Sequence, residues 1–245
     1  MATYRDQGIV LRTHKLGETD RILTLMTQGR GKVRAVAKGV RRPGSRFGGR
    51  LEPYSHVDLL LYEGRSLDVV TQADLLAPHA NIRADWHTST AAAVLVELID
   101  TVSVEGDRDN RLFLQLRAGL QALDAQPPDT RVFIDAFLLR VTGVVGFAVD
   151  TQRCATCGAA GPHPFLSIVL GGTLCADCAP GGTRAVAPDV VARLDVLSSD
   201  SWAPLVGLPD DDAGRVAASF AHAYAEHHLD RRLKSYPLSP RQAIA

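Results

Sequence analysis

The four cysteines of this chain all lie within residues 154–178, and this segment constrains the fold more than any other stretch. Their spacing is C-x2-C-x17-C-x2-C, which is typical of a tetrahedral zinc site. Each C-x-x-C turn directs two sulfurs toward one ion, and Gly158 after the first pair relieves the tight turn. The segment "FLSIVLGGTL" between the pairs predicts a hairpin with Gly171 and Gly172 at its tip. This hairpin would return the second cysteine pair to the first.

One structural Zn²⁺ is the cofactor that this pattern predicts. Four thiolates close the coordination sphere and leave no position for water, so the metal is expected to support the fold. Two disulfides are the alternative, which a reducing cytosolic setting disfavours. The expected metal ligands are Cys154, Cys157, Cys175 and Cys178.

The composition is that of a globular protein, with 46% hydrophobic and 22% charged side chains in 245 residues. The longest apolar stretches fall short of the roughly 20 residues that a membrane-spanning helix needs. The N-terminal residues lack the apolar core of a secretory signal. We therefore expect a cytoplasmic protein with no membrane partner.

Two kinds of hydrophobic pattern divide the chain near Pro78. Before it, five short segments rich in Val, Ile, Leu, Thr and Tyr alternate with turn residues, which predicts a small antiparallel barrel. The five-stranded OB-fold is the leading candidate. After Pro78, apolar residues recur three and four positions apart, as in amphipathic helices. Helices are expected at residues 88–103, 110–124, 130–147, 188–199 and 210–235.

These patterns predict an α+β protein in three parts. An N-terminal five-stranded OB-fold barrel is followed by a helical domain, into which the four-cysteine zinc module is inserted. The expected boundaries are 1–80 for the barrel, 81–149 and 183–237 for the helical domain, 150–182 for the zinc-ribbon-like module and 238–245 for a frayed tail.

Positive charge is concentrated in the predicted barrel, although the formal net charge is zero. Residues 1–80 carry 13 basic and 8 acidic side chains, whereas the remainder carries 14 basic and 19 acidic ones. Between Arg21 and Leu51 there are nine basic residues and no acidic one. Most of the nine are Arg, whose planar fork suits phosphate groups. We expect a nucleic-acid site here, and a merely solvated charged face is the alternative.

Eight of these cations and one aromatic ring are the expected nucleic-acid-binding residues. They lie on predicted strands and on the irregular loop at residues 41–50, in a fold that commonly binds single strands. Tyr4, Tyr54 and Tyr62 are further candidates for base stacking, although core packing is the simpler interpretation of each. The predicted site comprises Arg21, Lys32, Arg34, Lys38, Arg41, Arg42, Arg46, Arg50 and Phe47.

Catalytic motifs are not evident, and we expect a protein that is not an enzyme. The stretch "GRGK" lacks the first glycine of a phosphate loop and is followed by Val, so no nucleotide cofactor is expected. His222, His227 and His228 are interpreted as surface or packing residues of the last helix. The aspartates at 210–212 are interpreted as an N-terminal cap, and the cations at 231–234 as the matching C-terminal end of the helix dipole.

Three blocks of the sequence resemble the RecO family of bacterial recombination mediators. They are "GIVLRTHKLGETDRILTLMTQGRGKVRAVAKGVRRPGSRFGGRLEPYSHVDLLLY" in the barrel, "GFAVDTQRCATCG" at the zinc module and "HHLDRRLKS" near the C-terminus. The resemblance implies an OB-fold domain, a helical domain and an inserted zinc module. It also implies a protein that binds single- and double-stranded DNA, anneals complementary strands, and works with RecR to load RecA onto strands covered by single-strand DNA-binding protein.

The partners implied by the resemblance are DNA, RecR and the C-terminal tail of single-strand DNA-binding protein. The chain alone is expected to be a monomer and to associate with the nucleoid. RecR and DNA are both candidates for the barrel cations, and the sequence does not divide those residues between them. Two alternatives stay open: a zinc-ribbon OB-fold protein that binds RNA or acts in transcription, and an assembly scaffold whose basic patch meets an acidic partner.

Overall fold

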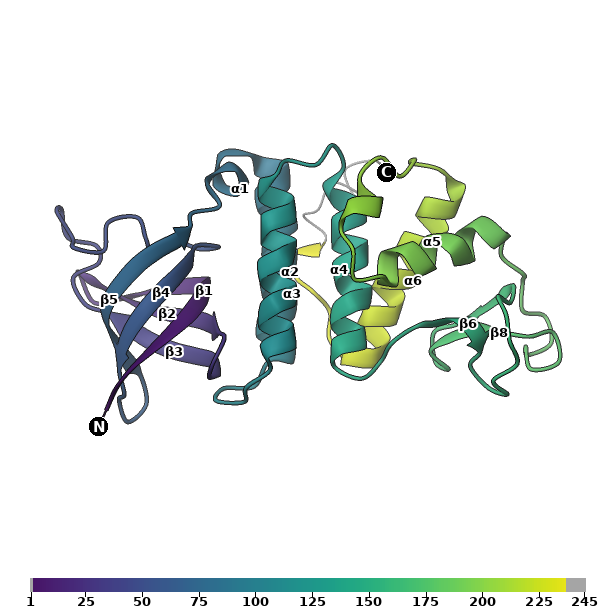
Figure 1. Cartoon of the computed structure of the whole chain (residues 1–245), viewed down its shortest axis with the longest axis horizontal. Coiled ribbons are helices and arrows are strands. Elements are labelled where there is room, and N and C mark those ends of the chain that lie inside the picture. The colour runs from purple at the N-terminus through teal and green to yellow at the C-terminus, as the bar shows by residue number, and fades with distance from the viewer. Residues whose placement is uncertain (1, 237–245) are drawn as a thin grey trace. The chain divides into compact units, whose positions relative to one another are not determined.

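The computed structural model describes residues 2–236 and forms two compact units, Met1–Gln126 and Pro127–Ala245 (Figure 1). The first unit contains the barrel and three helices, and the second contains the remaining helices and the cysteine segment. The predicted α+β class with a five-stranded barrel, helices and a four-cysteine module is confirmed. The finer domain boundaries stay a prediction, and the predicted tail at 238–245 lies outside the described residues.

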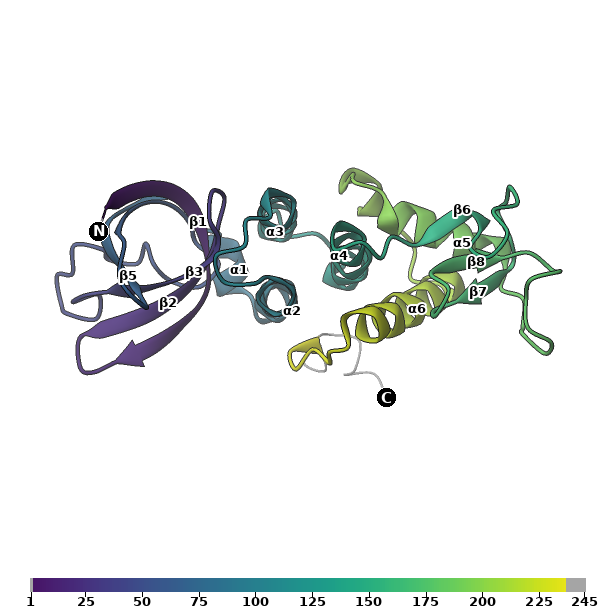
Figure 2. The same cartoon turned by 90° about the horizontal axis from the view of Figure 1, so that it is seen from below.

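Five strands close the barrel in the order β1-β2-β3-β5-β4, visible as a ring in Figure 2. All neighbouring pairs are antiparallel except β3 and β5, which pair in parallel through two register positions. A bulge between Val10 and Arg12 bends β1, which lets one long strand pair with both β2 and β4. The strands are β1 (Thr3–Leu16), β2 (Asp20–Thr27), β3 (Gly31–Ala37), β4 (His56–Tyr62) and β5 (Asp68–Ala77).

Alternating Val, Leu and Ala side chains from the strands fill the barrel. The long connection from β3 to β4 also contributes, because Val40, Phe47 and Leu51 are buried in the same core. The connection therefore has an irregular backbone, as predicted, but it is anchored by apolar side chains while its cations face outward.

Three helices complete the first unit: α1 (Ala80–Ala84), α2 (Trp86–Val102) and α3 (Asn110–Asp124). Asp85 and Asp109 cap α2 and α3, since their carboxylates accept hydrogen bonds from the first free backbone N–H groups. The short α1 was not predicted, because a single turn has no measurable hydrophobic period. In α3, Leu112, Phe113 and Leu116 belong to the buried stripe that the sequence pattern predicted.

The second unit is built around α4 (Thr130–Val144), which packs against α5 (Pro188–Ser198) and α6 (Asp212–Leu229). A short turn, η1 (Ala203–Leu205), lies between α5 and α6 along the chain. Most side chains of α4 are buried, as expected for a central helix.

The predicted end of the last helix at residue 235 is wrong. The helix α6 ends at Leu229 because Asp230 adopts a left-handed conformation. The following segment turns back, so that Leu233 is buried and the Tyr236 ring stacks on His222 at 3.9 Å. Consequently His227 and His228, not the cations at 231–234, occupy the last helical turn.

A small three-stranded sheet carries the cysteines, with strands β6 (Asp150–Cys154), β7 (Phe165–Ser167) and β8 (Gly172–Leu174) in the order β6-β8-β7. The antiparallel pair β7–β8 is the predicted hairpin. Gly171 lies in its turn with a φ of 84°, whereas Gly172, also predicted at the tip, is the first residue of β8. Throughout residues 2–236, every helix is too short or too polar to cross a lipid bilayer.

Candidate nucleic-acid interface and metal site

The four cysteines converge on one point, as their spacing predicts. Their sulfur atoms all lie within 4.8 Å of one another, and none of the four is in a disulfide. In the first knuckle the Gly158 N–H donates to the Cys154 carbonyl at 2.8 Å, and in the second the Cys178 N–H donates to the Cys175 carbonyl at 3.2 Å. Gly158 has a φ of 74°, a conformation that favours glycine, so the predicted reason for this glycine is confirmed.

The sulfur cluster has the dimensions of a tetrahedral metal site. Zinc–sulfur bonds of about 2.3 Å at tetrahedral angles place neighbouring sulfurs about 3.8 Å apart, and the sulfurs of Cys157 and Cys175 are 3.8 Å apart. Backbone N–H groups of Cys157, Cys175 and Thr156 stabilise the Cys154 thiolate and lower its pKa to about 6, whereas hydrogen bonds with the Cys175 and Cys157 side chains raise the pKa of Cys178. The cluster therefore fits a metal ion held by four thiolates.

Two of the three histidines of α6 are packing residues in this structure, and His227 is exposed. His228 bonds to the Ile168 carbonyl at 2.7 Å and lies against Tyr224, while His222 stacks on Tyr236. Among the residues that the structure describes, only the cysteines form a cluster with metal-ligand geometry. These environments agree with the prediction that the three histidines are surface or packing residues.

Five of the predicted cations gather at the end of β3 and on the following connection. They are exposed, and within residues 2–236 none of them forms an ion pair with a carboxylate. Successive turns hold this segment, and the Arg50 guanidinium donates to the Arg46 carbonyl at 2.9 Å. We call this set the loop cluster: Lys38, Arg41, Arg42, Arg46 and Arg50.

The turn between β1 and β2 fixes the base of the loop cluster. The Arg41 guanidinium donates to the Glu18 carbonyl at 3.0 Å, and the Asp20 carboxylate accepts from the Gly39 N–H at 2.8 Å. That backbone hydrogen bond, with smaller contributions from the Thr19 hydroxyl and two cations, lowers the pKa of Asp20. The cluster thus adjoins the β1–β2 loop, one of the loops through which OB-folds bind oligonucleotides.

The other three predicted cations are ion-paired inside the first unit. Arg21 meets Glu52 at 2.9 Å. Lys32 donates to the backbone carbonyl of Asp100 at 2.7 Å and lies 3.3 Å from its carboxylate. Arg34 faces Glu105 at 3.7 Å. The structure therefore separates the predicted site into a loop cluster without ion pairs and three cations with acidic partners.

Among the aromatic candidates for base stacking, Phe47 and Tyr4 are not open to a base. Phe47 is 1% exposed and its ring lies in the barrel core, with the Arg46 guanidinium 4.8 Å from the ring centre. We therefore correct the expected role of Phe47 from base stacking to anchoring the loop. Tyr4 donates a short hydrogen bond to Asp68 and is covered by Arg30, whereas Tyr62 is 38% exposed at the end of β4.

A second basic region lies beside the first half of β3, which does not pair with β5. It is a depression of about 410 Å³ that we call the basic groove, and its walls come from the β2–β3 turn, the β4–β5 loop and the α2–α3 loop. Sequence analysis missed Arg65 and Arg108 because they lie outside the basic run, and only the fold brings them beside it. The charged lining residues are Arg30, Lys32, Arg34, Arg65, Asp68, Glu105 and Arg108.

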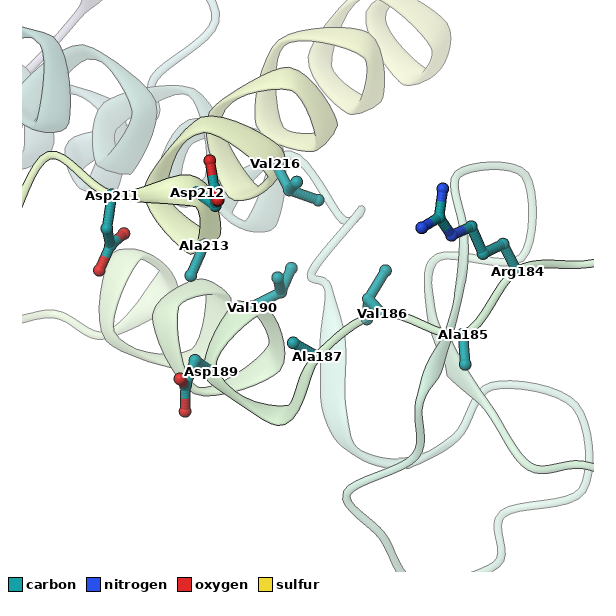
Figure 3. Close-up of a pocket in the computed structure, with 10 residues that line it drawn as sticks. All are labelled: Arg184, Ala185, Val186, Ala187, Asp189, Val190, Asp211, Asp212, Ala213 and Val216. Carbon is teal, nitrogen blue, oxygen red and sulfur yellow. The ribbon is translucent and has the colours of Figure 1, made fainter.

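A depression in the second unit has a different character (Figure 3). It measures about 600 Å³, with an apolar floor that includes Val186, Val190 and Val216. Its rim carries one cation, Arg184, and three carboxylates, at residues 189, 211 and 212. These carboxylates would repel phosphates, so the charge of this pocket differs from that of the loop cluster and the basic groove.

Two family models together match almost the whole chain. The family model described as recombination protein O N terminal matches residues 1–79, and the one described as recombination protein O C terminal matches residues 83–237. The chain belongs to the RecO family.

Curated RecO proteins match this chain over almost its whole length. The DNA repair protein RecO of Frankia casuarinae is 46% identical over 242 residues, which cover 97% of this chain and 98% of that protein. The DNA repair protein RecO of Nocardioides sp. is 45% identical, covering 95% and 97%, and that of Thermobifida fusca is 42% identical, covering 98% and 100%. The family resemblance drawn from the three sequence blocks is therefore confirmed.

Proposed function

We propose that this RecO-family chain is a recombination mediator in DNA repair. It binds single- and double-stranded DNA through the barrel, anneals complementary strands, and with RecR promotes RecA loading onto single strands covered by single-strand DNA-binding protein. In this function the chain binds and positions DNA, and no catalytic step is assigned to it.

The loop cluster carries the proposal. Five exposed cations on residues 38–50 form no ion pair with a carboxylate in the described part of the chain, and they adjoin the β1–β2 loop. Each phosphate that they neutralise releases condensed counterions, which gives affinity without sequence preference. Two complementary strands held on such a surface repel each other less, which favours annealing.

The partner proteins belong to the same proposal. RecR and the C-terminal tail of single-strand DNA-binding protein are proposed partners, the former on the barrel and the latter on the helical part. We also propose that the chain is a monomer by itself, in the cytoplasm and associated with the nucleoid. The metal is proposed to be a single structural Zn²⁺ bound by the four cysteines, because a closed thiolate set leaves no position for a substrate.

The test measures DNA binding and annealing with and without the loop cluster. In the variant Arg41→Ala/Arg42→Ala/Arg46→Ala, the salt slope on single-stranded DNA is expected to flatten by about 2, since each lost phosphate contact contributes about 0.7. Affinity at about 50 mM salt should fall at least tenfold for unrelated sequences alike, and annealing should slow in parallel. Fluorescence anisotropy gives the slope, and an annealing assay without nucleotide gives the rate.

A matched control removes three exposed arginines from the second unit, as Arg184→Ala/Arg231→Ala/Arg232→Ala. An equal loss in both variants would point to net charge rather than to the loop cluster. An unchanged slope in the first variant would remove this loop from the site. Tighter binding to RNA than to DNA, or no nucleic-acid binding at all, would favour an RNA-binding protein or an assembly scaffold respectively.

A further inference from the structure

The basic groove is built jointly by the barrel and by the α2–α3 loop. Arg30, Lys32 and Arg34 come from the β2–β3 turn and β3, Arg65 comes from the β4–β5 loop, and Arg108 comes from the α2–α3 loop. We propose that this groove binds the phosphate backbone of a nucleic-acid strand, and that Glu105 occupies it until a phosphate takes its place. The inference rests on the proposed DNA binding and adds a second contact region with its own regulation.

The groove exists because β3 is only partly paired with β5. The two strands pair through Ala35 and Val36, so the first half of β3 has no β5 partner. The α2–α3 loop fills part of this gap, since the Gly106 N–H donates to the Lys32 carbonyl at 3.0 Å. Gly31 permits this approach, because a Cβ atom there would lie 1.9 Å from the Asp107 carbonyl oxygen.

The charged side chains of the groove favour the binding of an anion, because its Asp68 is already hydrogen-bonded and two of its arginines have no carboxylate partner among the described residues. Asp68 is already engaged, since it accepts hydrogen bonds from the Tyr4 hydroxyl and the Gly64 N–H. Arg65 and Arg108 are exposed, and neither forms an ion pair with a carboxylate within residues 2–236. Two exposed cations from different loops therefore line a depression whose volume of about 410 Å³ is enough for a phosphate group with its hydration.

Glu105 is the carboxylate that a phosphate would displace. Its distance to Arg34 is 3.7 Å, and the two side chains are 53% and 46% exposed. A pair this long and this exposed is weak, because water and salt screen it. A phosphate that bridges Arg34 and Arg108 gains two charge-assisted contacts in exchange for one weak pair.

The position of the groove also favours a nucleic acid over an acidic protein segment. The groove lies at the start of β3 and the loop cluster begins at its end, and seven strand residues span about 20 Å. Arg34, which lines the groove, is exposed in the middle of β3 and brings the groove cations closer to the loop cluster. The cations thus follow one path of the length that an OB-fold uses for several nucleotides.

The experiment compares single variants of the zinc-loaded full chain by anisotropy with a labelled oligodeoxythymidylate of about 30 nucleotides. Arg65→Ala and Arg108→Ala should each weaken binding about threefold to tenfold at about 50 mM salt and flatten the salt slope by about 0.7. Glu105→Gln should tighten binding about twofold to fivefold, since it removes the competing anion. Arg111→Ala is the matched control: this arginine is exposed, lies three residues from Arg108, and does not line the groove.

Three results would overturn the inference. One is that Arg65→Ala and Arg108→Ala behave like Arg111→Ala while melting temperatures stay unchanged. Another is that Glu105→Gln binds no more tightly than the unmodified chain. A third is that both arginine variants keep oligodeoxythymidylate binding but lose a labelled oligo-glutamate peptide, which would assign the groove to an acidic protein segment. Failure of the proposed function is distinguishable, because then the unmodified chain itself binds no DNA at low salt.

Discussion

His56 is a buried histidine whose protonated form is destabilised in the folded protein. It is 6% exposed at the start of β4, and its ring meets Phe113 edge-on at 5.7 Å. Burial, with help from the positive charge of Arg117 and the nearby His79, lowers its pKa to about 4. Its Nε2 atom has no hydrogen-bond partner in the described structure. The neutral ring therefore behaves largely as an aromatic packing residue.

This residue predicts a loss of stability in mild acid. Unfolded, His56 binds a proton below about pH 6.5, whereas folded it binds one only near pH 4, so the unfolded state takes up more protons between these values. The free energy of unfolding should fall as the pH drops from about 6.5 to about 4, by at most about 3 kcal/mol from this group. Urea unfolding at a series of pH values measures the fall.

The variant His56→Phe isolates this contribution. It keeps an aromatic ring against Phe113 but cannot be protonated, so its stability should decline less than that of the unmodified chain over the same pH range. The cysteine cluster also loses thiolates in acid, and this loss is common to both proteins and cancels in the comparison. Parallel curves for the two proteins would show that His56 is not the titrating group.

At the scale of elements, the connection from β3 to β4 both completes the barrel core and presents the loop cluster. Phe47 serves both roles, because its ring is buried in the barrel core while Arg46 and Arg50 of the same connection are exposed. Phe47→Ala should reduce the free energy of unfolding by about 3 kcal/mol through the cavity it leaves. DNA affinity should also fall, since the cations lose their fixed positions.

Phe47→Leu distinguishes anchoring from base stacking. Leucine fills much of the same core volume but offers no aromatic face, so DNA affinity should stay within about twofold and stability within about 1.5 kcal/mol. Denaturant unfolding and anisotropy on the same preparations give both quantities. A large loss of affinity at unchanged stability in Phe47→Leu would restore the stacking role and contradict the anchoring role.

At the scale of the whole molecule, the proposed DNA contacts and the metal cluster belong to different compact units. The loop cluster and the basic groove lie in the first unit, and Cys154 and its partners lie in the second. Loss of the metal should therefore leave DNA affinity largely unchanged. This expectation follows from the two-unit organisation rather than from any one residue.

Metal removal tests this separation. Cys154→Ser, or chelation of the unmodified chain, should release one equivalent of metal and unfold the cysteine module, since thiolate–zinc binding supplies folding energy to such small modules. DNA affinity of the same samples should change less than about threefold. Metal analysis, thermal unfolding and anisotropy measure these effects. Retention of metal in Cys154→Ser would contradict the four-thiolate site, and a loss of DNA affinity equal to that of the loop variant would contradict the separation.

Features that depend only on residues close together in the sequence could be predicted from it. The cysteine spacing predicted the ligand set, and the period of apolar residues predicted five strands and most helices, because both follow from geometry within a few residues. The end of α6 was not predictable in this way. Its pattern continues to residue 235, but the backbone at Asp230 reverses because burial of Leu233 and stacking of Tyr236 stabilise the turn.

By itself, the sequence determined the fold class, the four cysteines that converge on one point and the segment in which positive charge gathers. Only the tertiary structure decided which of those cations are open to an anion. Lys32 and Asp100 are 68 positions apart, yet the packing of α2 against the barrel brings them together. Arg65 and Arg108 are likewise distant in sequence but line one groove. Charge density is a local property of the chain, whereas ion pairing depends on which distant backbone segments the fold places within about 4 Å.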